Sequence, residues 1–295
     1  MQYRSLGSTN LSVSAVGIGT WQFSGVWDKS FEQAEVNALF ARAGELGVNF
    51  IDTAECYGDH LSEGMIGEAI DGDRERWVIA TKFGHNPAND LGDENFGPAQ
   101  VRKQLEASLR ALRTDYIDVY QIHSASDELF DNDALWTMLD EQVNAGKVRY
   151  LGNSIGMPNQ RWQVEQSARF GIRVIQTIYN AVRPGARRHI FPVAEEQNLG
   201  VIARVPLASG FLSGKYRPGH KFPHSDVRSW RPQDGVDREI ARALAALEEK
   251  PAAMAPSTWA GAWCLQNPRV STIIPGAKSL TQLEENAAAA DVRLD

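Results

Sequence analysis

The feature of this sequence that most constrains its fold is a regular alternation of short β-rich segments with amphipathic helical segments, from Val16 to the carboxyl terminus. Such alternation is typical of βα units that build a parallel sheet. The eight predicted strands occupy residues 16–20, 48–52, 77–82, 116–123, 149–154, 174–177, 201–205 and 271–274. Eight βα units in about 300 residues are the inventory of an α/β fold of the (β/α)8 TIM-barrel type. We therefore predict such a barrel.

Helices are expected between these strands, and a β-hairpin is expected before them. The predicted helices cover residues 32–46, 61–70, 98–112, 133–145, 159–170, 237–248 with 256–266, and 280–289, and the segment 192–198 is expected to be irregular. Residues 3–6 and 11–14, joined by a turn at 7–10, form the predicted hairpin, which we expect to cap the bottom of the barrel. With 295 residues and 43% hydrophobic composition, the chain can form one large core, so we expect a single domain over 1–295.

A doubly wound open sheet is the alternative architecture, because it also alternates strands and helices. That fold usually carries a glycine fingerprint for a dinucleotide directly after its first strand. Here residues 17–22 lack the third glycine of that fingerprint. Residues 210–215 are one residue short of a phosphate-binding P-loop, and Tyr216 stands where a Ser or Thr would bind magnesium. The barrel is favoured because both nucleotide motifs are incomplete.

Charge and cysteine content exclude several classes of protein. The formal net charge of −7 argues against a surface that binds nucleic acid or an anionic membrane. Cys56 and Cys264 are too few for a disulfide framework, and residues 1–14 lack the apolar segment of a signal peptide, so a cytoplasmic location is expected. No apolar stretch approaches the roughly 20 residues that cross a bilayer. We expect small-molecule partners and no obligate protein partner.

Four proton-handling side chains stand at or just beyond the carboxyl ends of three successive predicted strands: Asp52, Tyr57, Lys82 and His123. The carboxyl ends of barrel strands converge on one face, so these side chains should meet there. Each of them alone would more often be structural, as a loop tyrosine, a buried ion pair or a satisfied histidine. Ionisable groups are costly to bury singly, so their combination is better explained by chemistry than by packing.

This set of residues predicts a general acid aimed at a polarised oxygen. A neighbouring ammonium stabilises a phenolate, so we expect Lys82 to lower the pKa of Tyr57 by roughly 1–3 units. Asp52 would keep the lysine charged, and His123 would direct the proton toward a substrate oxygen. The sequence shows no activated serine or cysteine, no paired carboxylates and no metal-ligand spacing, so a bound cofactor should supply the electron pair and no metal is expected. His220 and His224 lack an evident third ligand.

Short motifs along the whole chain resemble those of the aldo-keto reductases, a family of nicotinamide-dependent (β/α)8 oxidoreductases. They include GTW at 19–21, FIDTAECYG at 50–58, TKFG at 81–84, LRTDYID at 112–118, QIH at 121–123, GKVRYLG at 146–152, Gln176 with Tyr179-Asn180, segment 206–216, and IPGAK at 274–278 followed by Glu285-Asn286. The resemblance implies that Tyr57 is the acid, Lys82 its partner, Asp52 the charge partner of the lysine, and His123 the imidazole that orients the substrate.

The resemblance also implies NADP(H) as cofactor, with NAD(H) as the alternative. Ser154 and Gln176 would bind the nicotinamide carboxamide. The pyrophosphate would meet Leu207, Ser209, Leu212 and Lys215, the 2′-phosphate Lys278 and Ser279, and the adenine Glu285 and Asn286. Further expected cofactor contacts are Gly19, Thr20, Trp21, Asp52, Arg204, Pro206, Gly210, Gly276 and Gln282. Independently of the resemblance, residues 204–231 hold six basic residues and one acidic residue, a local charge of 6 − 1 = +5 that suits phosphates.

Three positions depart from the family pattern: Ile155 replaces an asparagine, Arg204 replaces a stacking aromatic residue, and Gln282 replaces an arginine. The resulting hypothesis is NADP(H)-dependent hydride transfer between nicotinamide and the carbonyl or alcohol carbon of a small aldehyde, ketone, sugar or polyol. Two alternatives are a nicotinamide-sensing module with slow turnover and a cofactor-independent barrel isomerase or lyase. Trp21, Trp27, His123 and Trp230 are predicted to line the substrate pocket. The loops 85–97 and 214–235 are expected to select the substrate.

Overall fold

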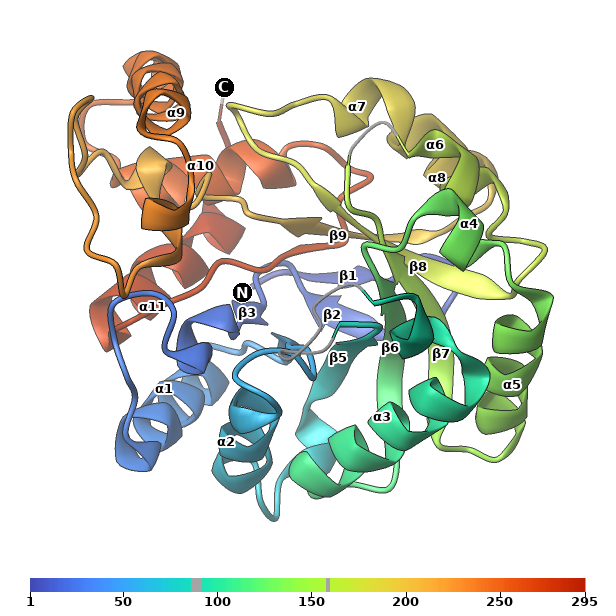
Figure 1. The fold of residues 1–295 in the computed structure, drawn as a ribbon. Helices are drawn as coiled ribbons and strands as arrows, with labels where there is room; N and C mark the ends of the chain where they lie inside the picture. The colour runs from blue at the N-terminus through green and yellow to red at the C-terminus, as the bar shows by residue number, and fades with distance from the viewer. Residues whose placement is uncertain (86–91, 158–159, 295) are drawn as a thin grey trace.

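Eight parallel strands form one sheet in the computed structural model, which describes residues 1–85, 92–157 and 160–294 (Figure 1). The strands pair in sequence order: β3 (Ile18–Gly19), β4 (Phe50–Asp52), β5 (Val78–Phe83), β6 (Ile117–His123), β7 (Val148–Ser154), β8 (Ile172–Ile178), β9 (Gly200–Arg204) and β10 (Thr272–Ile273). Parallel bridges from Val16 to Ile273 and from Gly19 to Gly276 join the last strand to the first. The predicted (β/α)8 fold class is confirmed.

Helices surround the strands on the outside (Figure 1). They are α1 (Gln33–Glu45), α2 (Leu61–Ala69), α3 (Pro98–Ala111), α4 (Asp127–Phe130), α5 (Asp133–Asn144), α6 (Arg161–Glu165), α7 (Ala186–His189), α8 (Phe191–Glu196), α9 (Gln233–Ala246), α10 (Pro256–Leu265) and α11 (Leu280–Ala288). Proline opens α3 and α10 at a position where its missing amide hydrogen costs nothing. The predicted helix 159–170 begins at a residue outside the described ones, and its predicted carboxyl end is wrong, because residues 166–171 form turns that lead through Gly171 at φ +67° into β8.

The amino end of the barrel is closed by the predicted hairpin, which consists of β1 (Tyr3–Ser5) and β2 (Ser12–Ser14). Leu6, Leu11 and Val13 of this hairpin are buried. They pack against apolar residues of the barrel interior, among them Phe50, Ala80, Val119, Val174 and Ile202. The hairpin therefore seals this end of the barrel, and the opposite end is where side chains can meet a ligand.

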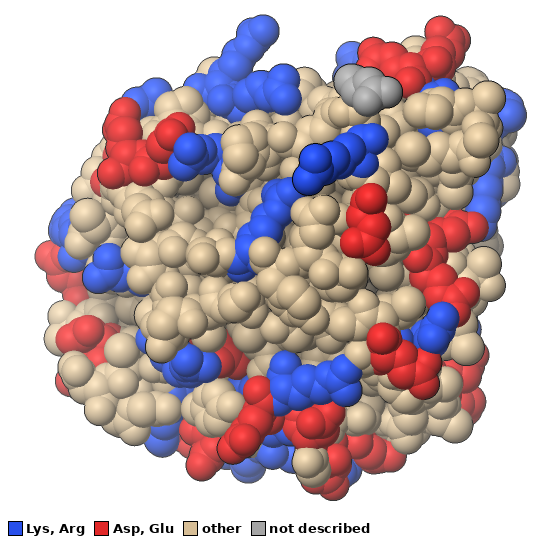
Figure 2. All heavy atoms as spheres, turned by 180° about the vertical axis from the view of Figure 1, so that it is seen from behind, with Lys and Arg blue, Asp and Glu red and all other residues tan. Residues whose placement is uncertain are grey.

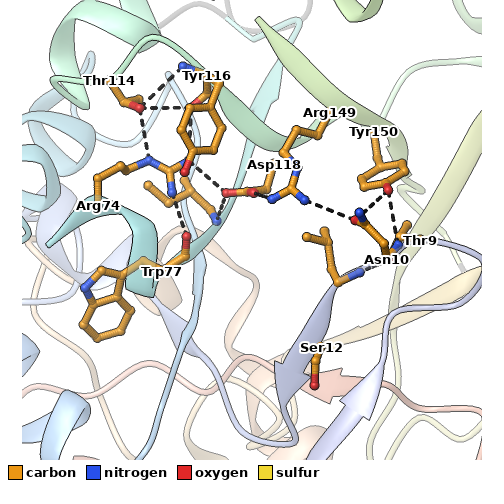
Figure 3. A network of polar contacts seen from close by, with 12 residues as sticks. Thr9, Asn10, Ser12, Arg74, Trp77, Thr114, Tyr116, Asp118, Arg149 and Tyr150 are labelled. Carbon is orange, nitrogen blue, oxygen red and sulfur yellow. Dashed lines mark hydrogen bonds and ion pairs between the residues drawn. The ribbon is translucent and has the colours of Figure 1, made fainter. Parts of the chain in front are cut away.

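An ion network centred on the buried Asp118 stabilises the same end (Figure 3). The Asp118 carboxylate, near the start of β6, forms ion pairs with Arg74 Nη2 at 2.8 Å and with Arg149 Nη1 at 2.7 Å. Arg149 also donates to Asn10 Oδ1 at 3.1 Å, and Tyr150 donates to the same oxygen at 2.7 Å. The network thus ties the hairpin turn to β6 and β7.

The surface carries both signs of charge. Figure 2 shows Lys and Arg side chains lying among Asp and Glu side chains on the face opposite to that of Figure 1. Across the described residues, no helix combines the length and apolar character that a membrane-spanning segment needs.

Candidate active site

The four predicted proton-handling residues converge at the carboxyl end of the barrel. Side chains of a strand alternate, so the inward position after Phe50 is Asp52, and the one after Ala80 is Lys82. Lys82 Nζ donates to Asp52 Oδ1 at 2.7 Å and lies 3.4 Å from the hydroxyl of Tyr57, in the turn after β4. His123 ends β6, and its ring centre lies 6.3 Å from that of Tyr57. The parallel register therefore assembles the group.

The Lys82 ammonium is held charged. Its third contact is the carbonyl oxygen of Thr53 at 2.7 Å. Burial lowers the pKa of Lys82, but Asp52 and Tyr57 together raise it above its ordinary value. Asp52 is itself held by Gln176, whose Nε2 donates to Oδ2 at 2.6 Å. A buried ammonium with three oxygen partners is thus fixed beneath the phenol.

The acidity of Tyr57 differs from the sequence-based expectation. Burial raises the pKa of Tyr57 to about 12, while the positive charge of Lys82 acts in the opposite direction. The prediction of a net lowered pKa is wrong, because the cost of removing the phenolate from water exceeds the stabilisation that the Lys82 charge provides. Tyr57 is consequently a protonated phenol at neutral pH, with an ammonium 3.4 Å away that stabilises the phenolate left after proton donation.

His123 is a neutral imidazole at neutral pH. Burial lowers the pKa of His123 well below its ordinary value, and His85, Lys82 and Arg204 lower it further. The ring stacks on that of His85, with the two centres 4.2 Å apart. A neutral imidazole can hydrogen-bond a substrate oxygen without adding a charge.

Asp52, Tyr57 and His123 line one end of a cavity of about 1190 Å³. Its walls include the predicted substrate-pocket residues Trp21, Trp27, His123 and Trp230. Trp21 and Trp27 meet edge to face at 5.1 Å, and Trp21 lies over Tyr57 at 6.0 Å. The predicted cofactor contacts on the wall are Gly19, Thr20, Trp21, Asp52, Gln176, Arg204, Pro206, Leu207, Ser209, Gly210, Lys215, Gly276, Lys278, Gln282, Glu285 and Asn286.

Three predicted cofactor contacts are not among the described residues that line the cavity. Ser154 is fully buried, and its hydroxyl donates to Gln176 Oε1 at 3.3 Å. Leu212 packs in an apolar cluster with Phe211 and Trp259. The Ser279 hydroxyl accepts the backbone amide of Gln282 and caps α11. Ser154 and Leu212 are thus buried beside the cavity, whereas Ser279 is exposed, and the three assignments stay predictions.

Two of the departures from the family pattern meet in space. Arg204, at the end of β9, donates through Nη2 to the carbonyl oxygens of Ile155 at 3.2 Å and Gly156 at 3.1 Å. Its Nε is buried and has no hydrogen-bond partner among the described residues. Two contacts from Nη2 therefore hold the guanidinium to the loop after β7.

The basic end of the cavity contains a residue that sequence reasoning did not assign to the site. Arg228 is buried and pairs with both carboxylate oxygens of Asp226, at 2.8 and 2.6 Å. Its guanidinium also lies over the ring of Phe222 at 4.0 Å. Arg228 belongs to the segment of net charge +5. Asp226, two positions before it, was the sequence signal that this arginine forms an ion pair. Cys56 and His85 line the cavity as well and were also missed, although Cys56 directly precedes Tyr57.

The model of the Aldo/keto reductase family matches residues 15–295. This protein belongs to the aldo/keto reductase family. An uncharacterized oxidoreductase of Mycobacterium tuberculosis is 35% identical over 96% of this chain and 86% of its own length. The aldo-keto reductase YhdN of Bacillus subtilis is 29% identical over 96% of this chain and 87% of its own length.

Solved structures agree with this assignment. The aldo-keto reductase AKR11C1 from Bacillus halodurans, in its holo form, superposes with a TM-score of 0.80 and 28% identity, over 99% of this chain and 92% of that one. Family membership supports nicotinamide-dependent oxidoreduction in general. Such cofactors are anionic and dinucleotide-sized.

The cavity of this aldo/keto reductase fits a nicotinamide dinucleotide. Arg204, Lys215, Arg228 and Lys278 line it against two carboxylates, Asp52 and Glu285. Asp52 is neutralised by Lys82, and Glu285 accepts a hydrogen bond from Ser257 at 2.7 Å. Arg228 is likewise neutralised by Asp226. Arg204, Lys215 and Lys278 therefore leave the wall net positive, which suits a pyrophosphate.

Proposed function

We propose that this protein is an NADP(H)-dependent carbonyl reductase and alcohol dehydrogenase for small aldehydes, ketones, sugars or polyols. The observation that carries the proposal is the contact of the Tyr57 hydroxyl with the Lys82 ammonium, 3.4 Å apart at one end of a cavity that can hold a dinucleotide. This arrangement provides a proton donor beside the place where a substrate oxygen gains negative charge.

When bound, the reduced nicotinamide supplies the hydride. Tyr57 donates its phenolic proton to the substrate oxygen as that oxygen becomes an alkoxide, and Lys82 stabilises the resulting phenolate. Asp52 keeps Lys82 charged through their 2.7 Å contact. His123 hydrogen-bonds the same substrate oxygen as a neutral imidazole and sets its direction. Trp21 and Trp27 shield the site from water.

Replacement of the phenol tests this proposal. Tyr57→Phe should lower turnover on an aldehyde by at least roughly 10²-fold, because it removes the proton donor and leaves the ring. Binding of NADPH, followed by its fluorescence, should remain. Tyr150→Phe is the matched control, since Tyr150 lies in the network at the amino end of the barrel and should keep full turnover.

Wild-type turnover by Tyr57→Phe would refute the assigned role. A slow release of cofactor after a single turnover by the unmodified protein would indicate the sensing module instead. No change in NADPH fluorescence on mixing would indicate an isomerase or lyase that works without nicotinamide.

The preference for NADP(H) rests on Lys278, which lines the basic end of the cavity. Lys278→Met should weaken NADPH binding by roughly 10–100-fold, because it removes a hydrogen bond to a charged phosphate, and should leave NADH binding unchanged. Lys221→Met is the matched control, because Lys221 is exposed in the same basic segment and lies outside the cavity wall of the described residues. Equal affinity of the unmodified protein for NADH and NADPH at low salt would contradict the preference.

A further inference from the structure

Three side chains that typically bind metals meet at the substrate end of the cavity. Cys56 follows β4, His85 follows β5, and His123 ends β6. One ligand atom from each lies within 4.8 Å of the other two, and all three residues are partly accessible. All three also line the cavity. They come from three consecutive βα connections, so no local spacing in the sequence announces them.

The spacing of these atoms suits a small tetrahedral ion. Cys56 Sγ and His123 Nδ1 are 3.8 Å apart. Zinc lies about 2.3 Å from a thiolate sulfur and about 2.0–2.1 Å from an imidazole nitrogen, so a tetrahedral angle separates these two ligand atoms by about 3.6 Å. The Cys56–His123 pair is therefore within a few tenths of an ångström of this separation. The other pairs lie within 4.8 Å, and since the two imidazole rings are stacked, one of them must turn before both can bind the same ion.

Neighbouring groups already restrain the histidines. His85 Nε2 lies 2.9 Å from the carbonyl oxygen of His123. The backbone amide of His85 donates to Glu55 Oε1 at 3.0 Å. Contacts of this kind from outside the first ligand sphere orient imidazole ligands in metal sites.

We propose that Cys56, His85 and His123 bind one Zn²⁺ ion, with the fourth coordination position open to the cavity. The bonds that form are one from the Cys56 sulfur and one from a nitrogen of each imidazole, and the thiol proton is released to solvent. A thiolate with two imidazoles selects zinc and similar borderline-soft cations over Mg²⁺ and Ca²⁺, which prefer oxygen ligands. Metal binding at this place competes with the carbonyl oxygen for His123. This last consequence rests on the proposed function.

Cobalt is the probe for direct binding, because Co²⁺ takes the same ligands and absorbs visible light. The full-length protein should bind one Co²⁺ per chain with a thiolate-to-cobalt charge-transfer band. Cys56→Ser should abolish the band, and Cys264→Ser, the matched control, should keep it because Cys264 is fully buried elsewhere. His85→Gln should weaken binding by more than the roughly 10–100-fold that loss of an outer partner costs.

Two outcomes of the cobalt titration would overturn the site: no charge-transfer band in the unmodified protein, or a band that survives in Cys56→Ser. The inhibition experiment is separate. Zn²⁺ should inhibit aldehyde reduction competitively with the aldehyde, and Cys56→Ser should reduce this inhibition by at least about tenfold. A protein that binds Co²⁺ through Cys56 but reduces no carbonyl would sustain the metal site and refute the proposed function.

Discussion

Two buried aspartates at opposite ends of the barrel each pair with basic side chains, but their surroundings differ. Asp52, at the carboxyl end, pairs with one ammonium at 2.7 Å and borders the cavity. Asp118, at the amino end, pairs with two guanidinium groups at 2.8 and 2.7 Å and also accepts the backbone amide of Ile79 at 2.9 Å. Both side chains are nearly inaccessible, at 3% and 1% of their surface. Burial and pairing alone therefore do not distinguish a reactive site from a structural one.

The two ends differ in the other contacts that the basic partners of the two aspartates make. The remaining donors of Arg74 bond to fixed oxygens, including the backbone carbonyls of Trp77 and Tyr116 (Figure 3). Lys82 directs its charge toward the hydroxyl of Tyr57, which can lose a proton into the cavity. A guanidinium keeps its proton and forms fixed forks, whereas an ammonium is a compact charge on a flexible stem. The amino end is thus suited to holding the fold, and the carboxyl end to moving a proton.

The largest expected effect comes from removing the basic partner at the carboxyl end. Lys82→Met should lower turnover by roughly 10²–10⁴-fold, because the phenolate left after proton donation loses its stabilising charge. Steady-state reduction of an aldehyde with NADPH measures this effect, and NADPH fluorescence verifies that the variant still binds cofactor.

Arg149→Met is the corresponding change at the amino end. It removes one partner of Asp118 and lies far along β7 from the cavity, so turnover should stay within about twofold of the unmodified protein at a temperature where both are folded. Comparable losses of turnover in the two variants would break the comparison between the ends.

The second prediction concerns stability. Asp118→Ala should lower the free energy of unfolding by about 3–5 kcal/mol, because it leaves the largely buried Arg74 and the buried amide of Ile79 without their partner. Urea unfolding followed by tryptophan fluorescence measures this change. The folded fraction should retain its turnover. A loss below about 1 kcal/mol would show that the network behaves as a surface ion pair.

The smallest effect is a difference in pH dependence between the two reaction directions. Carbonyl reduction requires the phenol form of Tyr57, whose pKa is raised to about 12, so this group should leave reduction unchanged from about pH 7 to about pH 10. Alcohol oxidation requires the phenolate form. The pH stays below the pKa of Tyr57 throughout this range, so the phenolate fraction, and with it the oxidation rate, should rise about tenfold per pH unit. Initial rates in both directions measure the two profiles.

Asp118→Asn should show the same two pH profiles as the unmodified protein, since it alters only the amino end. Identical profiles for reduction and oxidation in the unmodified protein would contradict the assignment of Tyr57 as the proton carrier.

Much of the carboxyl end could be predicted from sequence, because it follows from strand periodicity. Once residues 48–52 and 77–82 are taken as strands, Asp52 and Lys82 fall at strand ends, and parallel strands bring such ends together. The hairpin was predictable for a similar reason, since its apolar residues flank a turn. The burial of Ser154 and Leu212 was not predictable, because whether a side chain faces a cavity or lies beneath its wall depends on packing between elements.

The sequence by itself determined the eight βα units and the residue types that end each strand, since periodicity and the chemistry of the side chains are local properties. Only the tertiary structure decided the acidity of Tyr57, the pairing of Arg204 with the loop after β7, and the meeting of Cys56, His85 and His123. Each of these depends on desolvation or on distances between residues far apart in the chain. Burial and through-space charge have no counterpart in the order of the residues, so they appear only when the strands close into a barrel.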